Sequence, residues 1–494
     1  MILSPFLLLL HEKSKIRVRN RIILSILLAL TLLPMEAQDN AKMKWWDEAK
    51  YGMFITWGPY SMYGGVYKGH RQRFGGAEWI FNRCKIPYLE YRENASHFNP
   101  VAFDADSVIL LAKNAGMKYM VFTTKHHDGF AMYHSKASNY NIIDYTPFDR
   151  DITDELAAAC KRHGIRFGIY YSQEQDWGHP GGATARRPMK QGWAHPDSLL
   201  IDEYTRTHAG SWDGFQQTKS FDEYFEEVSL PQMKELLDRY GKDIAVIFFD
   251  YPVRISKEQG AKIAELLKEY PQIIINDRLQ QPYYPGDYKT PENVVPKAPD
   301  VEGIYWETCM CIGNSWGYKS WDTYKSPARI VNILISIASL GGNLLLNVGP
   351  DGNGLICDGE ASRLREIGKW MAAYGESIYG TSRSLLSPEW GRVTRKDYGK
   401  NSTLYLFVDK WPENGILSLD GNWKASRAYV LQNGVRVPCK RGKDALQLHV
   451  PAKAPEVLID GTPVIIRLDL RGRLPEVKLQ TNSSKRLGNL GIEE

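Results

Sequence analysis

In the stretch IAVIFFD, residues 244–250, six consecutive apolar residues lead directly into a carboxylate. An apolar run without alternation is typical of a parallel strand that is covered on both faces. Polar side chains that follow such a strand lie at the carboxyl edge of the sheet, where α/β proteins bind ligands. A buried carboxylate is costly unless it is paired or used. Asp250 is therefore either a functional group or a structural N-cap or ion-pair partner.

The same pattern recurs along the chain, with apolar runs that end in polar or aromatic residues and are followed by amphipathic helices. The other predicted strands are residues 51–57, 119–125, 166–172, 273–278, 304–308 and 343–348. The predicted helices are residues 104–114, 153–163, 221–240, 257–269 and 327–340. This alternation predicts a (β/α)8-like TIM barrel. A doubly wound open sheet is the alternative, but the first strand runs into WGPY (57–60), which is no glycine-rich phosphate turn.

The two ends of the chain differ from this barrel pattern. Residues 382–479 hold short strand-like segments separated by turn residues, which predicts a C-terminal all-β sandwich domain. Residues 1–37 have a basic cluster, the apolar run 22–33 and small residues near Ala37, the order of a secretory signal. We therefore expect a targeting segment (1–37), a barrel (38–381), a sandwich (382–479) and a polar tail (480–494).

The targeting segment predicts a secreted or periplasmic protein that is cleaved near Ala37. Its apolar run is shorter than the roughly 20 residues that span a bilayer, so we expect no stable membrane span, although an N-terminal anchor is the alternative. The formal net charge is +5, and residues 1–37 hold +3 of it. The nearly neutral remainder lacks the basic face that nucleic-acid binding requires. The six cysteines are too sparse for a disulfide scaffold and are interpreted as buried thiols, with one disulfide left open.

Carboxylates, imidazoles and aromatic rings follow the predicted strands. In a TIM barrel these strand ends meet on one rim, which is where the active site lies. Such a set of side chains suits a ring-shaped ligand with many hydroxyl groups. The residues in question are Thr56 and Trp57, Lys125 to Asp128, Tyr170 to Ser172, Phe248 to Asp250, Asn276 to Arg278, and Trp306 with Glu307.

Glycoside hydrolysis would need a second carboxylate beside Asp250, because one group attacks or activates water while the other donates a proton. Glu292, on the long loop between the fifth and sixth strands, and Glu307, at the end of the sixth, can both reach the rim. Each has a structural alternative, Glu292 as an exposed loop acid and Glu307 as a buried ion-pair partner. The adjacent His126 and His127 would face opposite sides of a regular strand, so they suit a metal site poorly.

Several motifs, in order, resemble the retaining α-L-fucosidases of glycoside hydrolase family 29. They are YGMFITWGPYS (51–61), TTKHHDGF (123–130), FGIYYS (167–172), WETC (306–309), SWGY (315–318) and LLNVGP (345–350). The resemblance covers residues 45–468 and implies a barrel followed by a sandwich. It implies an enzyme that releases fucose from oligosaccharides or glycoconjugates by double displacement, without metal or organic cofactor.

The resemblance also implies roles for individual residues. Asp250 matches the nucleophile, and Glu292 is the preferred acid/base, with Glu307 as the fallback. Trp316 or Phe249 is expected to pack against the methyl group of the sugar. The remaining matches are expected to hold the sugar or lie beside it: Glu78, Trp79, His126, His127, Tyr171 and Arg278.

Two departures from the family pattern bear on the sugar. Thr56 stands where the family usually has a histidine that contacts a sugar hydroxyl, and Tyr251-Pro252 follows the nucleophile where the family often has glycine. Three alternatives stay open: a fucose-binding protein that has lost catalysis, a retaining glycosidase for a related sugar such as a galactoside, and a metal-dependent barrel hydrolase. The fucosyl linkage and the oligomeric state are left open.

Overall fold

The computed structural model describes residues 35–72, 75–84, 86–182, 218–252, 254–475 and 477–481. Nearly all of the predicted targeting segment and of the polar tail therefore lies outside the described residues. Helix α2 (Met35–Ala49) is the first described element, and it includes Ala37.

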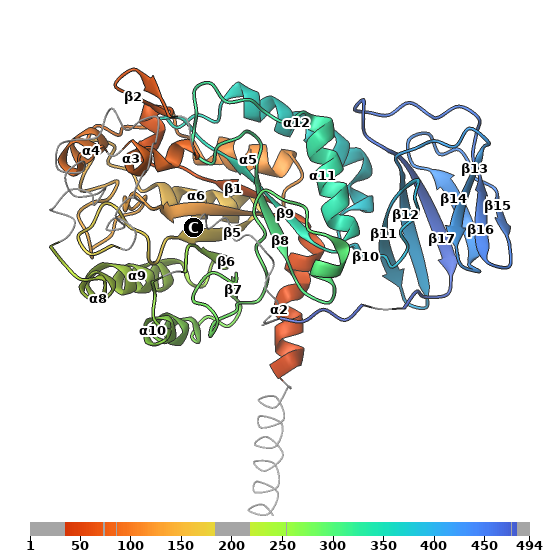
Figure 1. Cartoon of the computed structure of the whole chain (residues 1–494), viewed down its shortest axis with the longest axis horizontal. Coiled ribbons are helices and arrows are strands. Elements are labelled where there is room, and N and C mark those ends of the chain that lie inside the picture. The colour runs from red at the N-terminus through yellow and green to blue at the C-terminus, as the bar shows by residue number, and fades with distance from the viewer. Residues whose placement is uncertain are drawn as a thin grey trace, which may run out of the picture. The chain divides into compact units, whose positions relative to one another are not determined.

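Seven parallel strands form one sheet in the order β7-β6-β5-β4-β1-β9-β8 (Figure 1). Helices surround this sheet, and the central strands are buried along their whole length or nearly so, which is what their unbroken apolar runs require. The predicted (β/α)8-like barrel is confirmed. The strands are β1 (Tyr51–Ile55), β4 (Tyr119–Lys125), β5 (Arg166–Tyr171), β6 (Ile244–Phe249), β7 (Ile274–Ile275), β8 (Glu307–Cys311) and β9 (Asn343–Val348).

A segment without regular strand structure, residues 287–293, fills the place between β7 and β8. Pro291 has no backbone N–H to donate, so a continuous ladder cannot form there. The sequence predicted only a loop here, whereas the structure runs this segment along the barrel wall and so fixes Glu292 in it. The connecting hydrogen bonds are Asp287 N to Ile275 O at 2.7 Å, Lys289 N to Tyr305 O at 3.0 Å and Asn293 N to Cys309 O at 2.9 Å.

The strand predicted at 304–308 is displaced along the chain, because the apolar run continues through Met310 to Ile312. Strand β8 begins at Glu307 instead of ending there. Glu307 therefore lies at the opposite end of the strand from the rim. Strand β7 is also shorter than the predicted 273–278.

Several helices begin at residues whose side chains cap them. Asp104 and Asp151 accept hydrogen bonds from the first turns of α5 and α6, and Ser256 forms a capping box at α10. Gly164 ends α6 with φ +71°, a conformation that favours glycine. The predicted helix at 221–240 contains a π-helical turn, and α12 was not predicted. The barrel helices are α3 (Ile80–Arg83), α4 (Tyr88–Ala95), α5 (Ala105–Asn114), α6 (Ile152–His163), α8 (Phe221–Tyr224), the π turn η5 (Phe225–Ser229), α9 (Leu230–Tyr240), α10 (Lys257–Leu267), α11 (Pro327–Ser339) and α12 (Asp358–Tyr374).

The C-terminal strands form two antiparallel sheets, in the orders β10-β11-β12-β17-β14 and β13-β16-β15. Side chains such as Leu406, Leu417, Leu446 and Ile466 from both sheets make one apolar core. The predicted β-sandwich is confirmed. Its strands are β10 (Ser382–Arg383), β11 (Gly391–Tyr398), β12 (Asn401–Val408), β13 (Ile416–Asp420), β14 (Lys424–Val430), β15 (Cys439–Arg441), β16 (Ala445–His449) and β17 (Val464–Arg471).

Candidate active site

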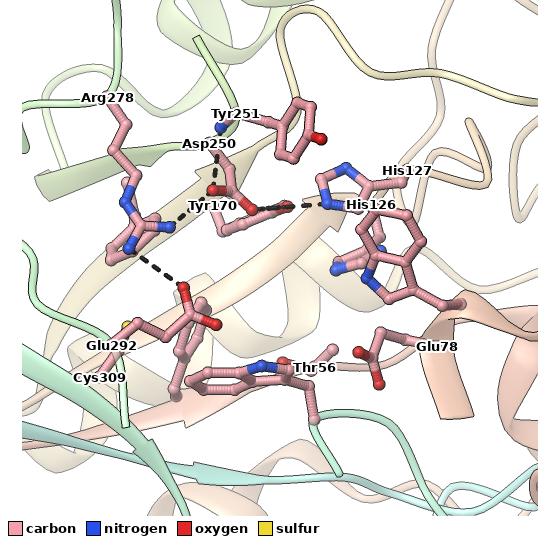
Figure 2. Close-up of a pocket in the computed structure, with 14 residues that line it drawn as sticks. Thr56, Glu78, His126, His127, Tyr170, Asp250, Tyr251, Arg278, Glu292 and Cys309 are labelled. Atoms are coloured by element: carbon pink, nitrogen blue, oxygen red, sulfur yellow. Dashed lines mark hydrogen bonds and ion pairs between the residues drawn. The ribbon is translucent and has the colours of Figure 1, made fainter. Parts of the chain in front are cut away.

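A pocket with about 510 Å³ of empty space lies where the barrel strands end (Figure 2). Carboxylates, imidazoles, a guanidinium and aromatic rings all face it. The lining residues are Phe54, Thr56, Glu78, Trp79, His126, His127, Tyr170, Phe248, Asp250, Tyr251, Arg278, Glu292, Cys309 and Trp316.

Asp250 follows β6 directly and is held by three donors. Arg278 Nη1 donates to Oδ1 at 2.8 Å, the Tyr170 hydroxyl donates to Oδ2 at 2.8 Å, and the backbone N–H of Tyr251 donates to Oδ1 at 2.9 Å. His127 Nε2 lies 3.5 Å from Oδ2. The carboxylate is only 16% exposed, so its orientation is fixed by these partners.

Arg278 connects Asp250 to the second carboxylate of the pocket. Its Nη2 donates to Glu292 Oε2 at 3.1 Å, while Nη1 holds Asp250. Thr290 anchors the guanidinium from behind, accepting from Nε at its hydroxyl and from Nη2 at its carbonyl oxygen, both at 2.9 Å. A planar fork that binds two carboxylates at once places them close together, as Figure 2 shows.

The charges in this group set the pKa of Glu292. Burial raises the pKa of its carboxyl, Arg278 opposes that rise, and the charge of Asp250 adds to it. Burial opposes the charge on Arg278, but Asp250 and Glu292 outweigh it and raise the pKa of the guanidinium. Glu292 can therefore carry a proton at a pH where an exposed glutamate has lost it, beside a permanently charged arginine.

His126 and His127 both line the pocket, because β4 ends at Lys125 and the chain has already turned. His126 stacks on Tyr170 with ring centroids 5.3 Å apart, and its Nδ1 has no hydrogen-bond partner among the described residues. Burial lowers the pKa of both imidazoles, that of His127 to about 3. Both rings are therefore neutral near pH 7.

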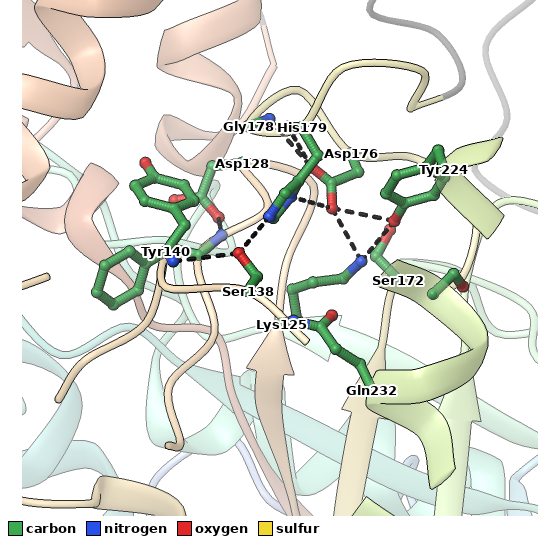
Figure 3. A network of polar contacts seen from close by, with 12 residues as sticks. Lys125, Asp128, Ser138, Tyr140, Ser172, Asp176, Gly178, His179, Tyr224 and Gln232 are labelled. Atoms are coloured by element: carbon green, nitrogen blue, oxygen red, sulfur yellow. Dashed lines mark hydrogen bonds and ion pairs between the residues drawn. The ribbon is translucent and has the colours of Figure 1, made fainter. Parts of the chain in front are cut away.

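A buried polar network is centred on Lys125, the last residue of β4, and Asp176 (Figure 3). Lys125 Nζ donates to Asp176 Oδ2 at 3.0 Å and to the Tyr224 hydroxyl at 2.7 Å, and His179 Nδ1 lies 3.0 Å from both oxygens of Asp176. The next residue, Trp177, donates its backbone N–H to the carbonyl oxygen of His127 at 2.7 Å. The network thus fixes the chain that carries the histidines.

Gly129 in the TTKHHDGF motif is required by this network. Its φ is +79°, and a Cβ atom there would lie 2.1 Å from Asp176 Oδ1. A larger residue would therefore displace the carboxylate that pairs with Lys125.

Glu78 is a third buried carboxylate in the pocket. The backbone N–H of Gly317 donates to its Oε2 at 2.8 Å, and its Oε1 has no hydrogen-bond partner among the described residues. Burial raises the pKa of this carboxyl to about 7. Thr56, in contrast, already uses its hydroxyl proton, which it donates to Asn347 Oδ1 at 2.7 Å.

The structure brings most of the predicted site residues together, but two lie elsewhere. Tyr171 points away from the pocket and donates its hydroxyl to Ser229 O at 3.1 Å and to Gln232 Oε1 at 3.0 Å. Glu307 is buried at the start of β8, where it accepts a hydrogen bond from the Tyr119 hydroxyl. The predicted residues that line the pocket are Thr56, Glu78, Trp79, His126, His127, Asp250, Arg278, Glu292 and Trp316.

Tyr170 and Phe248 were predicted at the strand ends, but the expected sugar contacts were those of Tyr171 and Phe249; in the structure Tyr170 and Phe248 line the pocket instead. Successive residues of a strand face opposite sides. For Phe248 this could have been predicted, because it lies two residues before Asp250 and therefore on the same face of the strand. No group of three or more histidine, cysteine, aspartate or glutamate side chains with metal-binding geometry occurs among the described residues.

A pair of carboxylates in an aromatic-lined pocket at the carboxyl face of a (β/α)8-like barrel is the arrangement that glycoside hydrolysis needs. Comparison with known proteins identifies the family. The family model described as Alpha-L-fucosidase matches residues 33–376, so the chain belongs to the α-L-fucosidase family.

Individual relatives are similar over most of their length. The tissue alpha-L-fucosidase of Mus musculus is 30% identical over 435 residues, which are 84% of this chain and 89% of that protein. The crystal structure of an alpha-L-fucosidase from Vibrio sp. strain EJY3 is 31% identical with a TM-score of 0.75, covering 89% of this chain and 74% of that one. A family 29 alpha-L-fucosidase from Bacteroides thetaiotaomicron, solved as a trapped covalent intermediate with 2-fluoro-fucosyl fluoride, is 28% identical with a TM-score of 0.72, covering 87% and 96%.

Proposed function

We propose that this protein is a retaining enzyme that removes terminal α-L-fucosyl groups from glycans by double displacement. One observation carries the proposal: a single guanidinium, that of Arg278, binds both Asp250 and Glu292 in the pocket. A retaining glycosidase needs two carboxyl groups about 5–5.5 Å apart, one to attack and one to transfer protons. A shared arginine limits how far apart the two carboxyl groups can lie, which supports this pairing.

In the first step, Asp250 attacks the anomeric carbon and forms a glycosyl-enzyme, while Glu292 gives its proton to the leaving oxygen. In the second step, Glu292 takes a proton from water, the water attacks the anomeric carbon, and Asp250 leaves. The raised pKa of Glu292 suits the acid role, and the neighbouring charges support it. The covalent intermediate trapped in the Bacteroides thetaiotaomicron relative supports this route.

The remaining pocket residues would hold the sugar. Glu78 Oε1 and His126 Nδ1 are buried polar atoms without partners among the described residues, so they can bind sugar hydroxyls at little cost. His127 is also close enough to Asp250 to be shared between it and a hydroxyl. Trp79 and Trp316 offer aromatic surfaces to the apolar parts of the sugar.

The test is hydrolysis of 4-nitrophenyl α-L-fucopyranoside by the parent and by three variants. Asp250→Ala is expected to lose turnover by several orders of magnitude. Glu292→Ala is expected to lose turnover and to recover it when azide is added, because azide attacks the glycosyl-enzyme without a general base. Glu307→Gln is the matched control, because this buried glutamate lies outside the pocket, and its turnover is expected to persist.

Product analysis completes the test. Proton NMR of the first product is expected to show α-L-fucose before mutarotation. First-formed β-fucose would contradict double displacement, and azide rescue of a Glu307 variant instead of Glu292→Ala would contradict the acid/base assignment. Faster turnover of the matching α-L-galactoside would contradict fucose as the preferred sugar. Loss of activity with a chelator would favour metal-dependent chemistry.

We also propose that residues 1–37 direct export, with cleavage near Ala37, from the basic cluster and apolar run described above. In the part of the chain that the structure describes, no helix combines the length and the apolar character needed to cross a membrane. Intact-mass analysis of the protein recovered outside the cytoplasm is expected to show a new N-terminus near Gln38. An uncleaved chain would contradict the proposal.

A further inference from the structure

Tyr251 has a backbone conformation that tyrosine rarely adopts. Its φ is +59°, in the left-handed region, and Pro252 follows it. This region is costly for residues other than glycine, and a following proline restricts a residue further. Asn293, directly after Glu292, also has a positive φ of +53°, but asparagine tolerates that region. Asp250 and Glu292 are thus each followed by a left-handed residue, and only the one after Asp250 is bulky.

The unusual backbone places a large ring in the pocket wall. Tyr251 is 8% exposed and lines the pocket, and its ring centroid lies 6.4 Å from that of Trp79 and 6.1 Å from that of His127. Its backbone N–H also helps to hold Asp250. Costly conformations persist where the surrounding structure maintains them, and they concentrate at functional sites. Glycine would relieve this one but would remove the ring.

Figure 2 shows on which side of the pocket the ring lies. Tyr251 is on the side of Asp250 and His127, whereas Glu292 lies across the pocket. In a double displacement the leaving group departs from the side opposite the nucleophile, next to the acid. The Tyr251 ring therefore faces the sugar that is transferred and not the group that leaves.

We propose that Tyr251 is a specificity-determining residue that closes the nucleophile side of the pocket, so that only an unsubstituted terminal α-L-fucosyl group fits. This inference rests on the proposed function and adds to it the substrate class. Fucosyl groups that carry a substituent on the ring hydroxyl facing Tyr251 would collide with a buried ring that Trp79 and His127 hold in place. Because the wall is close-packed, moving the ring aside would cost free energy.

The test compares the parent with Tyr251→Gly and Tyr251→Phe on 4-nitrophenyl α-L-fucopyranoside and its 2-, 3- and 4-O-methyl ethers. For each ether, the readout is its kcat/KM divided by that of the unsubstituted fucoside. In Tyr251→Gly this ratio is expected to rise at least about tenfold for one ether, the scale on which one carbon group is discriminated in a pocket. In Tyr251→Phe, which keeps the ring, the ratio is expected to stay at the parent value.

Partial misfolding lowers kcat/KM for every substrate by the same factor and leaves the ratios unchanged, so a rise in one ratio is specific. Unchanged ratios for all three ethers in Tyr251→Gly would overturn the inference, as would an equal rise in Tyr251→Phe. A shift in preference between aryl and disaccharide fucosides, with unchanged ether ratios, would place the ring on the leaving-group side and would also overturn it. Turnover of the unsubstituted fucoside by the parent tests the proposed function separately, because it does not depend on these ratios.

Discussion

Replacing Arg278 by methionine is expected to weaken both the fold and the reaction, because it removes the positive charge that binds two buried carboxylates. The Arg278 side chain is 3% exposed, and its partners Asp250 and Glu292 are 16% and 20% exposed. Removing one partner of a buried ion pair costs about 3–5 kcal/mol. A folded body of this size has an unfolding entropy near 1 kcal/mol per kelvin, so we expect the melting temperature to fall by about 3–5 °C.

The pH dependence of activity has a definite sign. Arg278 lowers the pKa of Glu292, whereas burial and Asp250 raise it. Without Arg278 the pKa of Glu292 rises further. Glu292 must carry a proton to act as an acid, so activity is lost as the pH rises through its pKa. The basic limb of the kcat/KM profile is therefore expected to move to higher pH. Turnover at the optimum is expected to fall at least about tenfold, because a hydrogen bond to a charged group contributes about 1.5–3 kcal/mol.

The assay is the kcat/KM profile for 4-nitrophenyl α-L-fucopyranoside from pH 4 to 9, with thermal melting of the same samples. Arg278→Lys is the matched control, because it keeps the charge but loses the planar fork. Its basic limb is expected to move less than that of Arg278→Met. An unchanged melting temperature in the methionine variant, or a basic limb that stays in place or moves to lower pH, would refute this reasoning.

Two further predictions use pairs of variants. Tyr170→Phe is expected to lower kcat/KM by about 10- to 100-fold, because it removes the hydroxyl that donates to Asp250. Tyr171→Phe should lower the melting temperature with little effect on kcat/KM, and equal effects of the two variants on kcat/KM would contradict the geometry. Burial and the charge of Lys125 hold the pKa of His127 at about 3, and Asp176 opposes them. Imidazole NMR titration should therefore show this pKa raised in Lys125→Met and lowered in Asp176→Asn, whereas shifts in the same direction would contradict the electrostatic cause.

The barrel and the place of Asp250 could be predicted from the sequence because they depend on local patterns. A strand covered on both faces must be apolar throughout, so IAVIFFD marks both a strand and the point where it ends. Asp250 lies at that end because it directly follows the strand, and this does not depend on which strands are its neighbours. The histidines after β4 follow the same rule. The sandwich could be predicted because its strands are short and separated by turn residues.

The acid/base candidate could not be placed in this way. Glu292 lies in a segment that Pro291 prevents from forming a regular strand, so no local period marks it as part of the barrel wall. Hydrogen bonds from this segment to β7 and β8, and the ion pair with Arg278, bring Glu292 to Asp250. Glu307 shows the converse. The sequence predicted it near the end of a strand, but it begins β8, because pairing with β9 sets where that strand starts.

The fold class, the order of the strands along the chain and most of the residues that line the pocket could be predicted from local sequence patterns. The sequence did not determine which of two neighbouring residues faces the pocket, because Tyr170 and Tyr171 are both buried and hydropathy cannot distinguish the two faces of a covered strand. Nor did it show the left-handed backbone of Tyr251. These features depend on strand register and on contacts between residues far apart in the chain, which exist only once the barrel has closed.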